Sequence, residues 1–128
     1  MTAKIRIMVV DDTWETCNNL QRLLELEEDI QVVGTASNGE EALRFAKVLL
    51  PDIVLMDINM PVMNGIQTTE QMTIELPQTA IIMLSVQAEQ EYIRQAKAAG
   101  ASEYLIKPPS IEALTQAVRR VYLSKKSR

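Results

Sequence analysis

The sequence predicts an α/β fold in which one parallel sheet of five strands carries helices on both faces. Short apolar stretches alternate five times with segments of helical periodicity, which is typical of strands joined by crossover helices. The 128 residues are enough for one such domain and too few for two ordinary ones. No internal repeat or low-complexity linker interrupts the alternation, so we expect a single domain.

Five apolar stretches are the expected strands. Each is short, rich in aliphatic residues and bounded by acids or turn residues, which is the pattern of a strand inside a sheet. The stretch Ile53–Met56 is wholly apolar, as expected of a strand that is buried on both faces. In chain order the expected strands are 5–10, 30–36, 52–57, 80–84 and 102–106.

Five helices are expected to follow these strands. In the first, Leu20, Leu23 and Leu24 recur at helical spacing and are expected to face the core. Gly100 is expected to end the fourth helix, and Ser110 to cap the fifth. In chain order the expected helices are 13–28, the segment from a capping box at 37–40 to Pro51, about 62–75, 88–99 and the segment that follows Ser110.

The charges are unevenly distributed along the chain. It has 13 Lys and Arg against 17 Asp and Glu, and residues 119–128 contain five basic side chains and no acidic one. Residues 1–118 therefore carry 8 basic against 17 acidic groups, a net charge of −9. This acidic body argues against nucleic acid as a direct ligand, and we expect the basic segment 119–128 to be a frayed, solvated terminus.

The residue types exclude several kinds of chemistry. The chain has no His and a single Cys, Cys17, which excludes an internal disulfide, a zinc site and Ser-His or Cys-His catalysis. No apolar run approaches the roughly 20 residues of a membrane span, and we expect a cytoplasmic protein without a membrane partner. The remaining chemistry must use carboxylates, hydroxyls and lysine.

Four of the five expected strands end in a residue that can bind or accept a phosphoryl group. The first strand leads to Asp11 and Asp12, the third to Asp57, the fourth to Ser85 and the fifth to Lys107. In a doubly wound sheet, the carboxyl ends of neighbouring strands converge where the strand order reverses. We therefore expect these side chains to share one shallow pocket.

Three carboxylates in one pocket repel one another unless their charge is offset. Raised pKa values or a bound cation would offset it. Oxygen ligands without His favour a hard ion such as Mg²⁺, which often shares phosphate oxygens. Lys107 adds a positive charge and Ser85 adds a hydroxyl donor for an anionic group. The cluster therefore predicts a phosphoryl group bound beside a metal ion.

Several short motifs also occur in the order and at the spacing of a known protein family. They are Val9-Val10-Asp11-Asp12, Met56-Asp57-Ile58-Asn59-Met60-Pro61-Val62-Met63-Asn64-Gly65, Ser85, Ala99-Gly100-Ala101, Tyr104 and Lys107-Pro108. With these motifs the sequence resembles, nearly end to end, the receiver domain of two-component response regulators. The resemblance implies a flavodoxin-like, doubly wound (βα)5 sandwich with the strand order 2-1-3-4-5.

The resemblance implies a role for each acid of the pocket. Asp57 is implied to accept a phosphoryl group from a sensor histidine kinase or a small phosphodonor. Asp11, Asp12, Asp57 and the backbone carbonyl of Asn59 are implied to bind Mg²⁺, which with Lys107 neutralises charge on the transferring oxygens. The chain is thus expected to be a phosphoacceptor that assists its own phosphorylation and dephosphorylation, and not a turnover enzyme.

The resemblance also implies a switch. Ser85 is implied to hydrogen-bond the phosphoryl group, Tyr104 to move inward, and the Lys107–Pro108 bond to be cis. The response is expected on the surface of the fourth helix, fifth strand and fifth helix, where an output domain, a partner protein or a second copy would bind. Residues 1–123 are expected to form the receiver, and 124–128 a basic tail or the start of a linker.

A softer resemblance concerns the output. Asp12-Thr13-Trp14-Glu15-Thr16 and Ser85-Val86-Gln87 are similar to receivers that precede MinD/CpaE-type ATPase domains. This similarity implies an excised receiver whose linker begins within 119–128. The alternative is a stand-alone receiver that docks to a partner protein, and the sequence does not decide between the two.

Other functions compete with this interpretation. A phosphatase of the haloacid dehalogenase type also uses a strand-end Asp nucleophile, but its second Asp is replaced here by Asn59. A flavodoxin-like electron carrier would need a phosphate-binding loop where this chain has Asp11 and Asp12. A receiver-like module that works without phosphate would not need both of these acids together with Asp57 and Lys107.

Single residues also have structural interpretations. Asp12 alone could cap the first helix, with Glu15 completing a capping box. Tyr104 alone could be a half-buried core residue of its strand. Trp14, the only tryptophan, is expected to cover the rim of the pocket.

Overall fold

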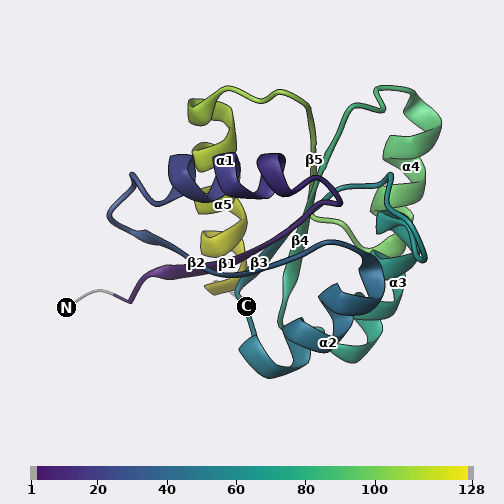
Figure 1. Cartoon of the computed structure of the whole chain (residues 1–128), viewed down its shortest axis with the longest axis horizontal. Coiled ribbons are helices and arrows are strands. Elements are labelled where there is room, and N and C mark those ends of the chain that lie inside the picture. The colour runs from purple at the N-terminus through teal and green to yellow at the C-terminus, as the bar shows by residue number, and fades with distance from the viewer. Residues whose placement is uncertain (1–2, 127–128) are drawn as a thin grey trace.

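The structure, a computed structural model, describes residues 3–126 and confirms the alternation of five strands with five helices (Figure 1). The strands are all parallel and form one sheet in the order β2-β1-β3-β4-β5, as the resemblance implied. The elements are β1 (Ile5–Val10), α1 (Trp14–Leu24), β2 (Ile30–Ala36), α2 (Gly39–Leu49), β3 (Ile53–Met56), α3 (Gly65–Glu75), β4 (Ala80–Ser85), α4 (Gln90–Ala99), β5 (Glu103–Ile106) and α5 (Ile111–Lys126).

The strand register brings the candidate site residues to one edge of the sheet. The last residues of β1 and β3 are partners, so Asp11 and Asp57, which follow them, leave the sheet side by side. Ser85, the last residue of β4, is the partner of the last residue of β5, which Lys107 follows. The carboxyl edge of the sheet therefore carries all four side chains.

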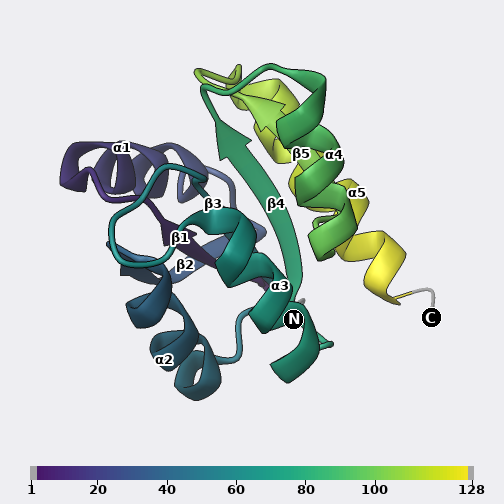
Figure 2. The same cartoon turned by 90° about the vertical axis from the view of Figure 1, so that its right-hand side faces the viewer.

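Helices cover both faces of the sheet, and each face has its own apolar core (Figures 1 and 2). The helices α1 and α5 pack on one face, where Leu55 and Ile82 are buried. The helices α2, α3 and α4 pack on the other, where Met56 and Met83 are buried. Every side chain of β3 is at most 1% exposed, so the backbone that carries Asp57 is held from both sides.

The first two helices differ from the prediction at one end each. The helix α1 ends at Leu24, because residues 25–29 form hydrogen-bonded turns before β2, and Leu23 is exposed instead of facing the core. The cap of α2 is Asn38, whose side chain accepts a hydrogen bond from the N–H of Glu41 at 2.8 Å. The capping interaction therefore lies one residue later than predicted.

The helix α3 begins at Gly65, three residues later than predicted. Asn64 and Gln67 form a reciprocal capping box, in which each side chain accepts a hydrogen bond from the other residue's backbone N–H. The N–H of Gly65 donates to the carbonyl of Ile58 at 2.9 Å. Residues 58–64 therefore form a loop whose two ends are hydrogen-bonded to each other.

The C-terminal helix is longer than predicted. The helix α5 continues through Lys126, so the prediction of a frayed terminus is wrong for residues 119–126. The guanidinium of Arg119 forms a forked pair with Asp29, with both N–O distances 2.9 Å. Residues 127–128 lie outside the described residues. Within residues 3–126, no helix is both long and apolar enough to cross a membrane.

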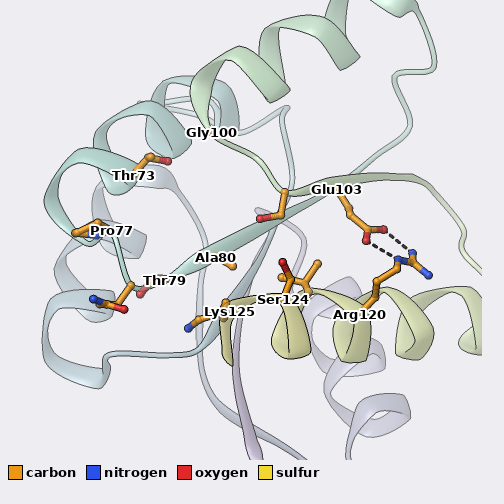
Figure 3. Close-up of a pocket in the computed structure, with 12 residues that line it drawn as sticks. Thr73, Pro77, Thr79, Ala80, Gly100, Glu103, Arg120, Ser124 and Lys125 are labelled. Atoms are coloured by element: carbon orange, nitrogen blue, oxygen red, sulfur yellow. Dashed lines mark hydrogen bonds and ion pairs between the residues drawn. The ribbon is translucent and has the colours of Figure 1, made fainter. Parts of the chain in front are cut away.

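A hollow of about 360 Å³ lies at the amino edge of the sheet, opposite the acidic strand ends (Figure 3). The turn before β4, the start of β5 and the end of α5 line it. A forked ion pair between Arg120 and Glu103, at 2.7 and 2.6 Å, spans part of this hollow. Because these charges satisfy each other and lie far from the acidic strand ends, we place the candidate site elsewhere.

Candidate functional site

Three carboxylates converge at the carboxyl edge of the sheet. Asp11 and Asp12 follow β1 and Asp57 follows β3, and one carboxylate oxygen from each lies within 4.8 Å of the others. Asp11 and Asp57 are buried, whereas Asp12 is exposed. The cluster is thus held by the protein on one side and open to solvent on the other.

Asp11 accepts three hydrogen bonds, two of them at its carboxylate. Its Oδ1 accepts a hydrogen bond from the N–H of Thr13 at 2.9 Å, and its Oδ2 accepts one from Nζ of Lys107 at 2.5 Å. The thiol of Cys17 donates to its carbonyl at 3.4 Å. Burial is the main reason that the pKa of the Cys17 thiol is raised, so the thiol remains a donor. The orientation of the Asp11 carboxylate is therefore fixed before any ligand binds.

Lys107 places a positive charge between the acids. Its Nζ lies 2.5 Å from Asp11 Oδ2 and 3.5 Å from Asp57 Oδ1, and the Lys107–Pro108 bond is cis, as expected. Burial alone would lower the pKa of Lys107, but the hydrogen bond to Asp11 and the charges of Asp57 and Asp11 outweigh it and raise the pKa. Lys107 is therefore a cation that partly offsets the charge of the cluster.

The surroundings of Asp57 disfavour the ionised form of its carboxyl. Burial, the largest effect, raises the pKa of its carboxyl, and the charge of Asp11 raises it further, while Lys107 lowers it. The net shift of the pKa is upward because the effect of burial exceeds that of Lys107. The donor atoms of the cluster are carboxylate oxygens, which fit a hard divalent ion such as Mg²⁺. A divalent cation at this place would stabilise the ionised form of Asp57 against the cost of burial.

Ser85 and Tyr104 are joined through the backbone of Gln87. The side chain of Ser85 is fully buried, and its Oγ accepts a hydrogen bond from the N–H of Gln87 at 3.1 Å. The hydroxyl of half-buried Tyr104 donates to the carbonyl of Gln87 at 2.6 Å. A displacement of Ser85 would therefore reach Tyr104 through one residue. The sequence predicted that Ser85 and Tyr104 act together, but not that the backbone of Gln87 connects them, because backbone atoms are the same in every residue type.

The loop after Asp57 contains Asn59 and ends at Gly65. Asn59 is exposed, and the role of its carbonyl as a metal ligand stays a prediction. A Cβ atom on Gly65 would lie 1.9 Å from the carbonyl oxygen of Asp57, so only glycine lets α3 start this close to the site. In the sequence Gly65 indicates only a break after the strand, and no local pattern reveals this close approach.

The start of α1 tests two expectations from the sequence. The N-cap residue is Thr13, without a side-chain capping bond, so the alternative that Asp12 caps this helix is wrong. Trp14 is 75% exposed, and it borders a hollow of about 250 Å³ together with Asp11 and Asp12. Trp14 therefore lies at the rim of this hollow, as expected, but its high exposure shows that it does not close the hollow.

Comparison with known proteins places this arrangement in context. A family model described as the response regulator receiver domain matches residues 7–119. The transcriptional regulatory protein LnrK of Bacillus subtilis is 42% identical over 118 residues, which cover 92% of this chain and 54% of LnrK. The transcriptional regulatory protein DegU of Brevibacillus brevis is 34% identical over 92% of this chain and 50% of DegU. The chain thus spans about half the length of the curated relatives it matches.

Solved structures share the fold over nearly the whole chain. The signal receiver domain of the putative response regulator NarL from Mycobacterium tuberculosis has a TM-score of 0.86 and 33% identity, covering 99% of this chain and 100% of that one. The response regulator domain of Thermotoga maritima CheB has a TM-score of 0.86 and 31% identity, covering 93% and 96%. A two-component response regulator of the LuxR family from Aurantimonas has a TM-score of 0.90 and 30% identity, covering 95% and 87%.

Proposed function

Because the chain belongs to the response regulator receiver domain family, we propose that it is a phosphoacceptor of a two-component system and that Asp57 receives the phosphoryl group. The observation that carries this proposal is the convergence of Asp11, Asp12 and Asp57, with Lys107 paired to Asp11 and Asp57. Asp57 is the member of the cluster that lies nearest the centre of the sheet, at the end of a strand buried on both faces. Such a rigid support is what a nucleophile needs to meet a donor in a fixed geometry.

In the proposed reaction, a carboxylate oxygen of Asp57 attacks the phosphorus of a phosphohistidine on a sensor histidine kinase. A new P–O bond forms while the P–N bond breaks, and the leaving imidazole keeps the electron pair and takes up a proton. Lys107, whose Nζ lies 3.5 Å from Asp57 Oδ1, favours the ionised nucleophile and can donate to the incoming phosphoryl oxygens. A small phosphodonor would react in the same way, with its own leaving group in place of imidazole.

Asp11, Asp12 and Asp57 would hold Mg²⁺ in this proposal, with the backbone carbonyl of Asn59 as a further protein ligand. The bound ion would supply positive charge that stabilises the phosphoryl oxygens. Lys107 donates to Oδ2 of Asp11, so the lysine and the ion would share this carboxylate. The exposed position of Asp12 supports this assignment, because Mg²⁺ usually keeps several of its waters.

The switch would start at Ser85 and end at a protein surface. Hydrogen bonding of the Ser85 hydroxyl to a phosphoryl group would disturb its bond with Gln87, and Gln87 also accepts the hydrogen bond of Tyr104. Tyr104 belongs to β5, the edge strand between α4 and α5. We propose that this surface binds an output domain, a partner protein or a second copy of the chain. If it binds a second copy, light scattering should show more dimer in the presence of a phosphoryl mimic.

The output that we propose is control of transcription. Both curated relatives named above are transcriptional regulatory proteins about twice as long as this chain. The hypothesis of an ATPase output domain finds no support among them, and we do not retain it. The proposed control would act through an output domain or a separate partner protein that responds to Asp57.

Intact-mass spectrometry tests the phosphoacceptor proposal. We expect one phosphoryl adduct after incubation with acetyl phosphate and Mg²⁺, and none when the metal is chelated or in Asp57→Asn. The control is Asp52→Asn at the opposite end of the same strand, where Asp52 accepts a hydrogen bond from the N–H of Arg6 at 2.8 Å. This control should be modified like the parent protein. An adduct that persists in Asp57→Asn would overturn the proposal.

A further inference from the structure

Two of the helices begin at an Asn-Gly pair. Asn38 caps α2, whose first residue is Gly39, and its side chain accepts a hydrogen bond from a backbone N–H of the first turn at 2.8 Å. Asn64 caps α3, whose first residue is Gly65, and its side chain accepts the equivalent hydrogen bond at 2.9 Å. The ψ angle of the asparagine, which orients the next peptide nitrogen, is 172° in the first pair and 168° in the second. The two pairs are therefore closely matched in sequence and in local geometry.

An Asn-Gly pair can lose ammonia by a reaction within the chain. The peptide nitrogen of the glycine loses its proton and attacks Cγ of the asparagine, so that a new N–C bond forms. The bond from Cγ to the side-chain nitrogen breaks, and ammonia leaves with the proton that the peptide nitrogen lost. Water then opens the resulting cyclic imide at either carbonyl. The product is aspartate, or isoaspartate, in which the main chain runs through the former side chain.

The two pairs differ in the hydrogen bond of the glycine N–H. The N–H of Gly65 donates to the carbonyl of Ile58 at 2.9 Å, and both of these residues are buried. This hydrogen bond must break before the nitrogen can lose its proton and turn toward the side chain of Asn64. Within residues 3–126, no group accepts a hydrogen bond from the N–H of Gly39, which as the first residue of α2 has no partner inside its helix. The nitrogen of Gly39 is therefore the one that can react without breaking a hydrogen bond of its own.

Packing and capping act alike on the two pairs. Both asparagines are half-buried. A Cβ atom on Gly39 would lie 2.0 Å from Oγ1 of Thr68, and one on Gly65 would lie 1.9 Å from the carbonyl oxygen of Asp57, so both glycines lie in filled surroundings. Each capping hydrogen bond also polarises the side-chain carbonyl of its asparagine, which makes Cγ a better target for attack. The hydrogen bond of the glycine N–H is thus the difference that bears on the nucleophile.

We propose that Asn38-Gly39 is a site of spontaneous deamidation in the folded protein, and that the hydrogen bond from Gly65 to Ile58 protects the second pair. The co-reactant of this modification is water. The inference goes beyond the proposed function and does not depend on it, because the reaction needs neither Mg²⁺ nor a phosphoryl donor.

The two products should affect α2 differently. Aspartate is as good a capping residue as asparagine, and its negative charge would lie at the positive end of the helix. Isoaspartate adds an atom to the main chain before Gly39, whose surroundings are already filled by Oγ1 of Thr68 and the carbonyl oxygen of Met63. The isoaspartate form should therefore displace the start of α2 and unfold at a lower urea concentration than the aspartate form.

The main experiment incubates the folded protein at mildly alkaline pH and follows both asparagines by peptide mass spectrometry. We expect Asn38 to be modified at least about tenfold faster than Asn64, the factor that one buried hydrogen bond represents. The same incubation in urea is the control, because the hydrogen bond to Ile58 is absent from the unfolded chain and both pairs should then react at similar rates. Equal rates in the folded protein, or a faster reaction at Asn64, would overturn the inference. An unmodified folded protein, after a time that converts the unfolded chain, would overturn it as well.

Hydrogen exchange and two variants test the separate steps. The amide of Gly65 should exchange more slowly than that of Gly39, and the opposite order would contradict the explanation of the protection. Asn38→Ser keeps a capping hydroxyl but has no amide to cyclise, so a change of mass that persists in this peptide would place the reaction elsewhere. Asn38→Asp reproduces the aspartate product and should match the urea midpoint of the parent. The isoaspartate form, separated by chromatography, should have a lower midpoint than Asn38→Asp, and equal midpoints would refute the packing argument.

Discussion

Replacing Gly65 with Ala should separate the position of α3 from the chemistry of the site. A Cβ atom at this position would lie 1.9 Å from the carbonyl oxygen and 2.7 Å from the carbonyl carbon of Asp57. Ordinary contacts of a Cβ begin at 3.4 Å, so the start of α3 must move by more than about 1 Å. The obstacle is the backbone of a buried strand end, which cannot turn aside as a side chain can.

The expected cost has two parts. Displacing α3 weakens the hydrogen bond from Gly65 to the carbonyl of Ile58, which is worth about 1 kcal/mol. Forcing a methyl group into a filled space adds about 1–3 kcal/mol. Gly65→Ala should therefore lower the free energy of unfolding by about 2–4 kcal/mol, and it should slow phosphorylation because the displaced start of α3 packs directly against the backbone of Asp57.

Urea unfolding followed by circular dichroism measures the first effect, and the rate of adduct formation with acetyl phosphate measures the second. The control is Gly34→Ala in β2, where the nearest atom is Cδ1 of Leu49, the movable end of a side chain. We expect it to cost less than about 1 kcal/mol and to leave phosphorylation unchanged. A Gly65→Ala variant as stable and as reactive as the parent would refute this reasoning.

Three further predictions concern side chains. Lys107→Met should lower stability by about 2–4 kcal/mol, because it leaves Asp11 and Asp57 without their cationic partner. Mg²⁺ should then stabilise the variant more than the parent in thermal unfolding, and equal stabilisation of both proteins would contradict this role of Lys107. The hydrogen bond from Arg119 lowers the pKa of Asp29, so the contribution of this ion pair to stability is present above about pH 4 and lost on acidification. Because the pair is partly exposed, urea unfolding should show that Arg119→Gln costs at most about 1 kcal/mol at pH 7 and less at pH 3. An equal cost at both pH values would exclude the ion pair with Asp29 as the cause. Tyr104→Phe removes the hydrogen bond to the backbone carbonyl of residue 87 and should lower stability by about 1 kcal/mol without preventing phosphorylation; loss of the adduct would show that Tyr104 acts in the transfer itself.

Much of the fold follows from patterns that are local in the sequence. Apolar stretches that alternate with helical periodicity predict a parallel sheet, and a parallel sheet brings its strand ends to one edge. The positions of Asp11, Asp57 and Lys107 at three strand ends are therefore enough to predict that they lie together. The structure adds the distances that make Lys107 a bridge between the two acids.

Other features depend on contacts that no local pattern shows. Ser37 and Asn38 are both good capping residues, and the choice between them depends on Glu41, whose carboxylate accepts from the N–H and hydroxyl of Ser37. In the sequence, Arg119 belongs to a basic segment that is typical of a loose tail. In the structure it is paired with Asp29, which is remote in the sequence. The positive φ of Val62 is a property of the backbone in its loop, and a valine in the sequence does not indicate it.

The most direct test of the central claim is to locate the phosphoryl group within the chain. After incubation with acetyl phosphate and Mg²⁺, borohydride reduction converts an aspartyl phosphate to homoserine, which peptide mass spectrometry assigns to a residue. The arrangement of the acidic cluster predicts homoserine at position 57 and at no other acid. Homoserine at position 11 or 12, or none in a protein that remains folded, would contradict the assignment of Asp57 as the phosphoacceptor.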